Sequence, residues 1–92
     1  MAIEFEWDGV KAQDNLSKHG ISFEDATSAF YDPLSVTISD PDHSTNESRF
    51  LLIGRTIEDW LVVVAHTDRG QRIRIINARR ATRLERASYE ES

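Results

Sequence analysis

The feature that most constrains the fold of this chain is one stretch of eight residues, WLVVVAHT at positions 60–67. Its apolar side chains fall on both faces of an extended strand, whereas a half-exposed strand would alternate apolar and polar residues. Its apolar part, WLVVVA, is the longest apolar run in the chain and is far too short to span a membrane. We therefore expect a central strand of a sheet.

Two helices are predicted ahead of this strand. Residues 3–7 (IEFEW) alternate like a first strand, and Asp8 then suits the N-cap of a helix over residues 9–19. The letters SFED resemble a second capping box with aspartate in place of glutamate. They predict a second helix that ends at Asp32, because the proline that follows disfavours helical geometry there.

After Asp32 the pattern changes to the two-residue repeat of strands. Leu34, Val36 and Ile38 alternate and should point inward. Further strands are predicted at residues 49–56, 60–67 and 72–77. The short turns between these last three strands imply antiparallel pairing.

Together these elements predict an α+β fold: one strand, two helices, an antiparallel sheet and a C-terminal helix. A chain of 92 residues should form a single domain, 1–92. With 39% hydrophobic and 29% charged residues it reads as globular, and it has no cysteine for disulfides or thiolate metal sites. It begins without the apolar segment of a signal peptide, so we expect a cytoplasmic protein without membrane contacts.

The formal net charge of −5 is unevenly distributed. Residues 1–60 hold 12 acidic and 4 basic side chains, a net −8, whereas residues 61–92 hold 4 acidic and 7 basic, a net +3. All seven of those basic residues are arginine, whose planar fork of donors suits phosphate and carboxylate. Three explanations of this concentration of arginines remain open: a phosphate ligand, an acidic protein partner, or a helix face that is merely solvated.

The strongest candidate site is the arginine cluster within this segment. Arg72 and Arg74 share one face of a predicted strand. A T-x-x-E capping box at residues 82–85 starts the last helix at about residue 83, which places Arg79 and Arg80 in the connection beside a helix N-terminus. Such side chains could converge on a polyanion.

Cleavage of RNA by its own 2′-hydroxyl needs a base for that hydroxyl, an acid for the leaving oxygen, and cations for the charged phosphorane. The arginines supply the cations. His66, at the end of the central strand, is a candidate base or acid, unless it is a satisfied, partly buried histidine. Tyr89 on the last helix could stack on a base or donate a proton, or it could pack in the core.

Two further groups of polar residues share a face. Lys11, Asn15 and Lys18 lie on one stripe of the first helix with His19 next to them, and most such stripes are only solvated. Glu47 and Arg49 are two residues apart on a predicted strand and could pair with each other or with the basic strand.

No metal ion or other cofactor is expected. The letters DPDH at positions 40–43 resemble a ligand set, but they lie in a proline-containing loop and match no established ligand spacing. The chain also lacks the glycine-rich nucleotide-binding, G-x-S-x-G and H-E-x-x-H motifs, which excludes the common nucleotide-binding, hydrolase and zinc-protease classes.

Four motifs follow one another along nearly the whole chain: W-D-x-x-K-x-x-x-N-x-x-K-H-G, E-x-R-F, I-G-R and A-R-x-A-T-x-x-E-x-x-x-Y. In this order they resemble the BrnT family of type II toxins. The resemblance implies a RelE-like fold and a toxin that cleaves RNA without a metal and inhibits translation. It also implies a BrnA-type antitoxin with a ribbon-helix-helix domain. This antitoxin would form a heterotetramer with the toxin, and the complex would bind operator DNA only through the antitoxin.

The resemblance also implies site positions. The family motif falls here on Lys11, Glu47, Arg49, Arg74, Arg79, Arg80, Glu85 and Tyr89. Of these we expect Glu85 to be a helix cap, and the family often has serine where this chain has Asn77. The expected catalytic residues are Arg79, Arg80, His66, Lys11 and Tyr89, and the expected RNA-binding residues are Arg72, Arg74, Arg49 and Glu47. The alternative is a non-catalytic module whose arginines hold an acidic protein segment or nucleic acid.

Overall fold

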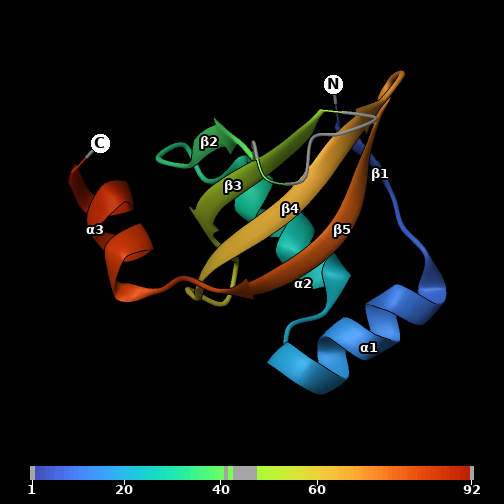
Figure 1. The fold of residues 1–92 in the computed structure, drawn as a ribbon, viewed down its shortest axis with the longest axis horizontal. Helices are drawn as coiled ribbons and strands as arrows, with labels where there is room; N and C mark the ends of the chain where they lie inside the picture. The colour runs from blue at the N-terminus through green and yellow to red at the C-terminus, as the bar shows by residue number, and fades with distance from the viewer. Residues whose placement is uncertain (1, 41, 43–47, 92) are drawn as a thin grey trace.

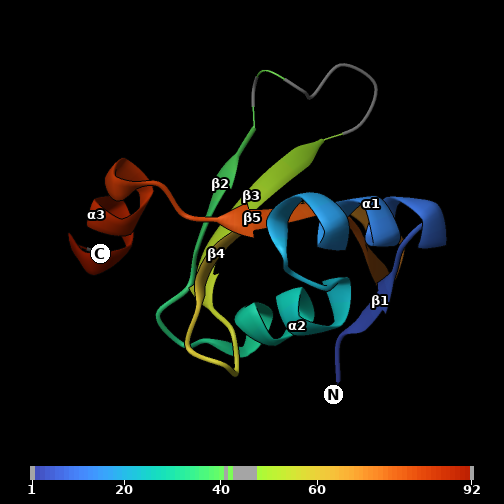
Figure 2. The same ribbon diagram turned by 90° about the horizontal axis from the view of Figure 1, so that it is seen from below.

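The computed structural model describes residues 2–40, 42 and 48–91. Its elements are β1 (Glu4–Glu6), α1 (Gly9–His19), α2 (Phe23–Ser28), the 3₁₀ helix η1 (Ala29–Tyr31), β2 (Val36–Ser39), β3 (Arg49–Arg55), β4 (Leu61–Arg69), β5 (Arg72–Arg80) and α3 (Arg83–Glu91). Helices α1 and α2 cover one face of the sheet, here the α1/α2 face, and α3 lies on the other, the α3 face (Figures 1 and 2). None of the helices in these residues has the length and apolar content needed to cross a bilayer.

The helix ends confirm the capping predictions. The Asp8 carboxylate accepts hydrogen bonds from the first-turn N–H groups of α1, and Gly20 ends that helix in the left-handed conformation at φ +70°. The Ser22 hydroxyl accepts from the Asp25 N–H at 3.0 Å and so caps α2. The α-helical geometry ends at Ser28, earlier than predicted, and η1 continues the turn up to Asp32.

The sheet has the order β1-β5-β4-β3-β2, so the apolar run predicted to be central is central. Strands β3, β4 and β5 pair antiparallel, as their short turns predict. The prediction of a wholly antiparallel sheet is wrong for β1, which runs parallel to β5 with Phe5 opposite Ile73. Because no short turn joins β1 to β5, turn lengths gave no information on its direction, and parallel pairs are joined by long crossovers.

The inward alternation predicted for residues 34–38 is also wrong in part. Leu34 is 66% exposed and Ile38 is 49% exposed, whereas Val36 is half-buried. Strand β2 is the edge of the sheet and has only β3 beside it, so fewer neighbours cover its side chains.

Alternate side chains of β4 enter two different cores, which is why its first five residues, 61–65, are all apolar. The core under α1 and α2 consists of Ile21, Phe23, Ala26, Ala29, Leu52, Val62, Val64, Ile75 and Ala78. The smaller core under α3 consists of Ile53, Leu61, Val63 and Tyr89. Close packing of η1 on β3 requires Gly54, where a Cβ atom would lie 2.9 Å from the Ala29 carbonyl oxygen.

Strand β5 contains a bulge that changes which residues face which core. Ala65 of β4 pairs with Asn77 and the next residue, His66, pairs with Ile75, so Ile76 is an extra residue in β5. Ile75 and Ala78, three residues apart, therefore lie in the same core. The bulge thus brings residues 72, 74, 77 and 79 to the α3 face.

The edge of β5 beyond β1 is closed by a side chain instead of a strand. The Asn15 amide nitrogen donates to the Ala78 carbonyl at 2.8 Å and to the Ile21 carbonyl at 2.9 Å. Its amide oxygen accepts from the Ala78 N–H at 3.0 Å. Asn15 is only 5% exposed, so these bonds are largely shielded from water and fasten α1 to the edge of β5.

His66 belongs to the α1/α2 face and is 5% exposed. Its ring contacts Phe30 at 4.8 Å and Phe50 at 5.8 Å between centroids, and neither ring nitrogen has a hydrogen-bond partner within the described chain. Burial lowers the pKa of His66 from 6.5 to about 4, against a smaller opposing effect of the Asp68 charge. The imidazole is therefore neutral near pH 7 and packs as an aromatic side chain.

Replacement of Asn15 by leucine should destabilise the fold. Asn15→Leu removes three hydrogen bonds and leaves the buried N–H and carbonyl of Ala78 without their partner. We expect a loss of about 2–4 kcal/mol in the free energy of unfolding, measured by urea denaturation. Gln13→Leu, the same type of change at an exposed position of α1, should change it by less than about 0.5 kcal/mol; equal losses in the two variants would contradict the role of Asn15.

The buried neutral His66 should make stability depend on pH. Because the folded-state pKa is depressed, its contribution is complete above about pH 6.5 and is lost as the pH falls towards 4. Replacing it with phenylalanine should remove up to roughly 3 kcal/mol of the change in unfolding free energy between pH 7 and pH 4. Denaturation curves of wild type and His66→Phe between pH 7 and pH 4 test this prediction. If the unfolding free energies of the two proteins changed equally with pH, His66 would not be buried as a neutral ring.

Candidate nucleic-acid interface

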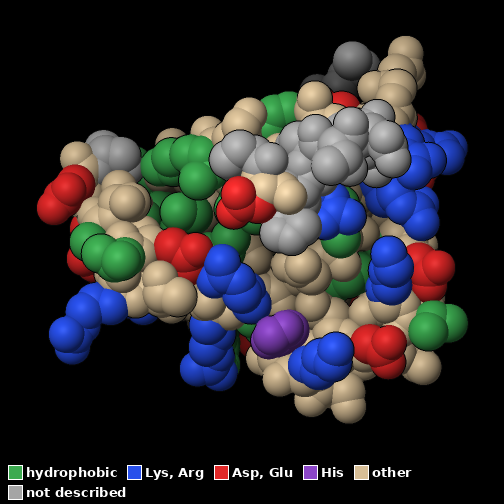
Figure 3. All heavy atoms as spheres, viewed as in Figure 1, with side chains coloured by type: hydrophobic (Ala, Val, Ile, Leu, Met, Phe, Trp, Pro, Cys, Tyr) green, Lys and Arg blue, Asp and Glu red, His purple; other side chains and the backbone are tan. Residues whose placement is uncertain are grey.

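The α3 face carries most of the predicted arginine site. Arg72 and Arg74 precede the bulge of β5 on this face, and Asn77 follows it. Arg49 of β3 and Arg74 of β5 both pair in register with Thr67 of β4, so they flank the same point of the sheet. Figure 3 views this face and shows Lys and Arg side chains over the region of β1, β4 and β5.

Two carboxylates of β1 hold the guanidinium groups of Arg72 and Arg74. Arg74 lies 2.9 Å from Glu6, and Arg72 lies 3.3 Å from Glu4 and 3.8 Å from Glu6. Arg72 is 60% exposed, so its ion pairs are screened by water and contribute little to stability. The parallel pairing of β1 with β5 thus orients these arginines while leaving the Arg72 guanidinium accessible to an anion.

Arg79 has a different environment. Its guanidinium makes a bidentate contact with Glu85 of α3 at 2.7 and 2.8 Å. Glu85 also caps α3 by accepting from the Thr82 N–H at 2.8 Å, as the capping box predicts. The hydrogen bonds from Arg79 lower the pKa of Glu85 to about 2, and Glu85 raises the pKa of Arg79. In this structure Arg79 therefore fastens α3 to the sheet, with its donor fork already occupied by a carboxylate.

The structure does not bring Arg79 and Arg80 together. Both are the last residues of β5, so the predicted placement in the connection to α3 is wrong. Only the Arg79 side chain reaches the start of α3, through Glu85. Consecutive strand residues point to opposite faces, and Arg80 stacks on Trp60, with 3.5 Å from guanidinium carbon to ring centroid. The capping box correctly located the start of α3 but not the end of β5.

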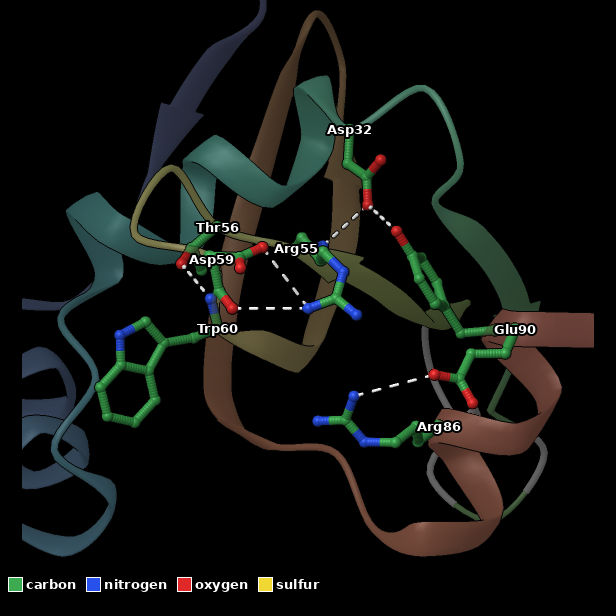
Figure 4. Close-up of polar contacts among 8 residues, drawn as sticks. Asp32, Arg55, Thr56, Asp59, Trp60, Arg86 and Glu90 are labelled. Atoms are coloured by element: carbon green, nitrogen blue, oxygen red, sulfur yellow. Dashed lines mark hydrogen bonds and ion pairs between the residues drawn. The ribbon is translucent and has the colours of Figure 1, made fainter.

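The two other expected proton-transfer residues are buried. His66 lies on the α1/α2 face, away from Arg72 and Arg74, with its ring nitrogens inaccessible. Tyr89 is 6% exposed, and its hydroxyl donates to the Asp32 carboxylate at 2.7 Å. That carboxylate also accepts from the Arg55 backbone N–H at 2.8 Å, and Figure 4 shows Asp32 beside Arg55. Burial and the bond to Asp32 raise the pKa of Tyr89, so its hydroxyl keeps its proton and joins α3 to the end of η1.

Lys11, another expected catalytic residue, lies exposed in a hollow of the surface. Together with Lys18, His19 and Asp14 of α1 it lines a groove of about 250 Å³, whose other wall includes Asn77 of β5. We call this hollow the α1–β5 groove. The sequence predicts a solvated stripe on this helix, which is wrong for Asn15, because that residue is buried against β5. The structure adds that Lys11 and Lys18 share the groove with Asn77.

The remaining expectations concern Glu47 and metal binding. Glu47 lies outside the described residues. Within residues 2–40, 42 and 48–91, no three His, Asp or Glu side chains are close enough to share a metal ion.

Comparisons with known proteins bear on the family. Among solved structures the chain is similar to the 1.1 Å crystal structure of the Brucella abortus ribonuclease toxin BrnT, with a TM-score of 0.60 and 24% sequence identity, over 89% of this chain and 100% of that one. At that identity the likeness shows the fold. No curated protein matches the chain. The family model described as the ribonuclease toxin BrnT of type II toxin–antitoxin systems matches residues 7–85. That span covers most of the chain, which therefore belongs to the BrnT family of ribonuclease toxins.

Proposed function

We propose that this protein is an endoribonuclease toxin that binds RNA along the α3 face of β5 and cleaves it without a metal ion. Membership of the BrnT family supports the ribonuclease class and a type II antitoxin partner. The observation that carries the location is the β5 bulge. It puts Arg72, Arg74 and Asn77 on one face and leaves Asn77 at the border of the α1–β5 groove.

The path of the RNA follows from these positions. Its phosphates would contact Arg72 and Arg74, with Arg49 on the far side of β4, and the chain would continue past Asn77 to Lys11. A guanidinium fork suits phosphate oxygens, and the ammonium of Lys11 is a compact positive charge for the same purpose. Arg79 and Tyr89 support this surface by holding α3, and Arg80 lies on the other face.

The reaction we propose is attack of a 2′-hydroxyl on the adjacent phosphorus, which needs no added nucleophile. Positive charge at the phosphorane is the largest contribution a protein can supply to this step. In this chain Lys11 and the arginines of β5 provide that charge. The products would be a 2′,3′-cyclic phosphate and a 5′-hydroxyl.

The cellular role is proposed from the family. Cleavage of cytoplasmic RNA by this chain would inhibit translation. A BrnA-type antitoxin with a ribbon-helix-helix domain would neutralise it in a heterotetramer, and operator DNA would be bound only through that antitoxin. The mixed sheet with helices on both faces supports a RelE-like architecture.

Removal of two β5 arginines should weaken RNA binding. We expect Arg72→Gln/Arg74→Gln to lower the affinity for single-stranded RNA at least about tenfold and to reduce the slope of log affinity against log salt by about 1.4. Fully 2′-fluoro RNA, which lacks the attacking hydroxyl, allows binding to be measured without cleavage. The matched control is Arg83→Gln/Arg86→Gln, which removes the same charge from exposed positions of α3.

Equal losses of RNA affinity in the two double variants would contradict the proposed path. They would mean that RNA binds elsewhere or that the affinity depends only on the net charge of the protein. Unchanged binding in the β5 variant would contradict the proposed path. Wild-type protein that binds RNA but leaves unmodified RNA intact would favour the non-catalytic alternative.

Cleavage should continue in the presence of a chelator. Because the charge at the phosphorane comes from lysine and arginine, we expect the same cleavage rate with and without EDTA. The RNA fragments, analysed by mass spectrometry, should end in 2′,3′-cyclic phosphates. Loss of activity in EDTA that added Mg²⁺ restores would contradict the metal-independent mechanism.

A further inference from the structure

The α1–β5 groove lies where the edge of β5 is not covered by another strand. β1 pairs with β5 only at residues 72–74, and Asn15 occupies the backbone of Ala78 further along. Between these points the bulge residue Ile76 and its neighbour Asn77 form one wall of the groove. The other wall is α1, with Lys11, Asp14, Lys18 and His19.

The charge and position of this groove fit a phosphate of a bound RNA. The α1 wall carries two lysines and one aspartate, a net positive charge before His19 is counted. Asn77 lies three residues along β5 from Arg74, a distance of roughly 10 Å. An RNA segment of a few nucleotides held by Arg72 and Arg74 therefore reaches the groove without leaving the surface.

Proton transfer in this groove needs a group that exchanges protons near neutral pH, and imidazole is the side chain best suited to it. The described residues include two histidines. His66 is buried between Phe30 and Phe50 on the α1/α2 face, with neither nitrogen accessible. His19 is exposed and lines the groove beside Lys11 and Lys18.

We propose that His19 is the general base of the RNA cleavage reaction in the α1–β5 groove, an assignment that rests on the proposed ribonuclease function. The imidazole takes the proton of the 2′-hydroxyl, and the 2′-oxygen forms a bond to phosphorus. The bond from phosphorus to the 5′-oxygen breaks, and that oxygen takes a proton from the Lys11 ammonium. Lys18 balances the charge of the phosphorane, and His19 and Lys11 return to their starting protonation states through solvent.

The charged groups that face His19 in the groove are Lys11, Asp14 and Lys18 of α1, while Ile76 and Asn77 of β5 carry no charge. Asp14 is thus the other possible base in the groove. Separate replacement of the two residues distinguishes them, because a carboxylate base and an imidazole base give different pH–rate profiles.

The test compares His19→Ala with wild type in single-turnover cleavage of unmodified RNA and in binding of 2′-fluoro RNA. We expect cleavage to fall by about a hundredfold to ten-thousandfold while the dissociation constant changes less than about threefold. Free imidazole should restore part of the cleavage rate of His19→Ala, and the pH–rate profile of the variant should lose the limb due to the base. Gln13→Ala, an equal truncation at an exposed position of α1, should behave as wild type.

A His19→Ala variant that cleaves at the wild-type rate would overturn the assignment and leave the ribonuclease function intact. The assignment would also be overturned if imidazole did not rescue the cleavage defect of His19→Ala and Asp14→Asn lost cleavage completely. Wild-type protein that cleaves no RNA would contradict the proposed function itself, and the assignment with it. Equal melting temperatures for His19→Ala and wild type exclude unfolding as the cause of any loss.

Discussion

The bulge at Ile76 is the constraint on which both faces of this sheet depend. Without the extra residue, the side chains after Ile75 would continue the original alternation, and Ala78 would leave the core while Arg79 entered it. The Asn15 amide fixes the strand on the far side of this irregularity by pairing with the backbone of Ala78. One local change of register therefore determines how α1 attaches to the edge of β5 and which way the basic residues of β5 point.

The arginines of β5 differ in function because their surroundings differ. Arg79 is held by a carboxylate of α3 in a bidentate contact, and the Arg80 guanidinium lies over an indole ring. Both contacts use the planar guanidinium, so the exclusive use of arginine in this segment has structural reasons as well as a proposed RNA-binding one. Arg72 and Arg74 are paired with carboxylates of β1 near water, where a phosphate can compete with them.

Elements encoded by neighbouring residues were predictable from the sequence. The caps at Asp8 and Ser22 and the central strand follow from short patterns, and the structure has each of them. Features that depend on contacts between distant segments were not predictable. The parallel pairing of β1 and the end of β5 at Arg80 each require knowledge of which residues meet in space. The same is true of the choice between a catalytic and a buried His66, both of which the sequence left open. For the same reason the sequence could not show that Lys11 and Lys18 of α1 share a groove with Asn77 of β5.

The uneven distribution of charge along the sequence is also found in the folded protein, where Arg72 and Arg74 lie together on the α3 face. Helix α3 is held over one end of its face by Arg79 and by the bond from Tyr89 to Asp32. Arg72, at the start of β5, is 60% exposed. At physiological salt the potential of a charged group decays over about 8 Å. Most acidic residues of the first 60 positions thus have little effect on Arg72 and Arg74, but Glu4 and Glu6 contact these two arginines directly and balance their charge. In a protein with a net charge of −5, phosphates of RNA can therefore bind Arg72 and Arg74 by displacing these carboxylates, with contact rather than long-range attraction supplying the affinity.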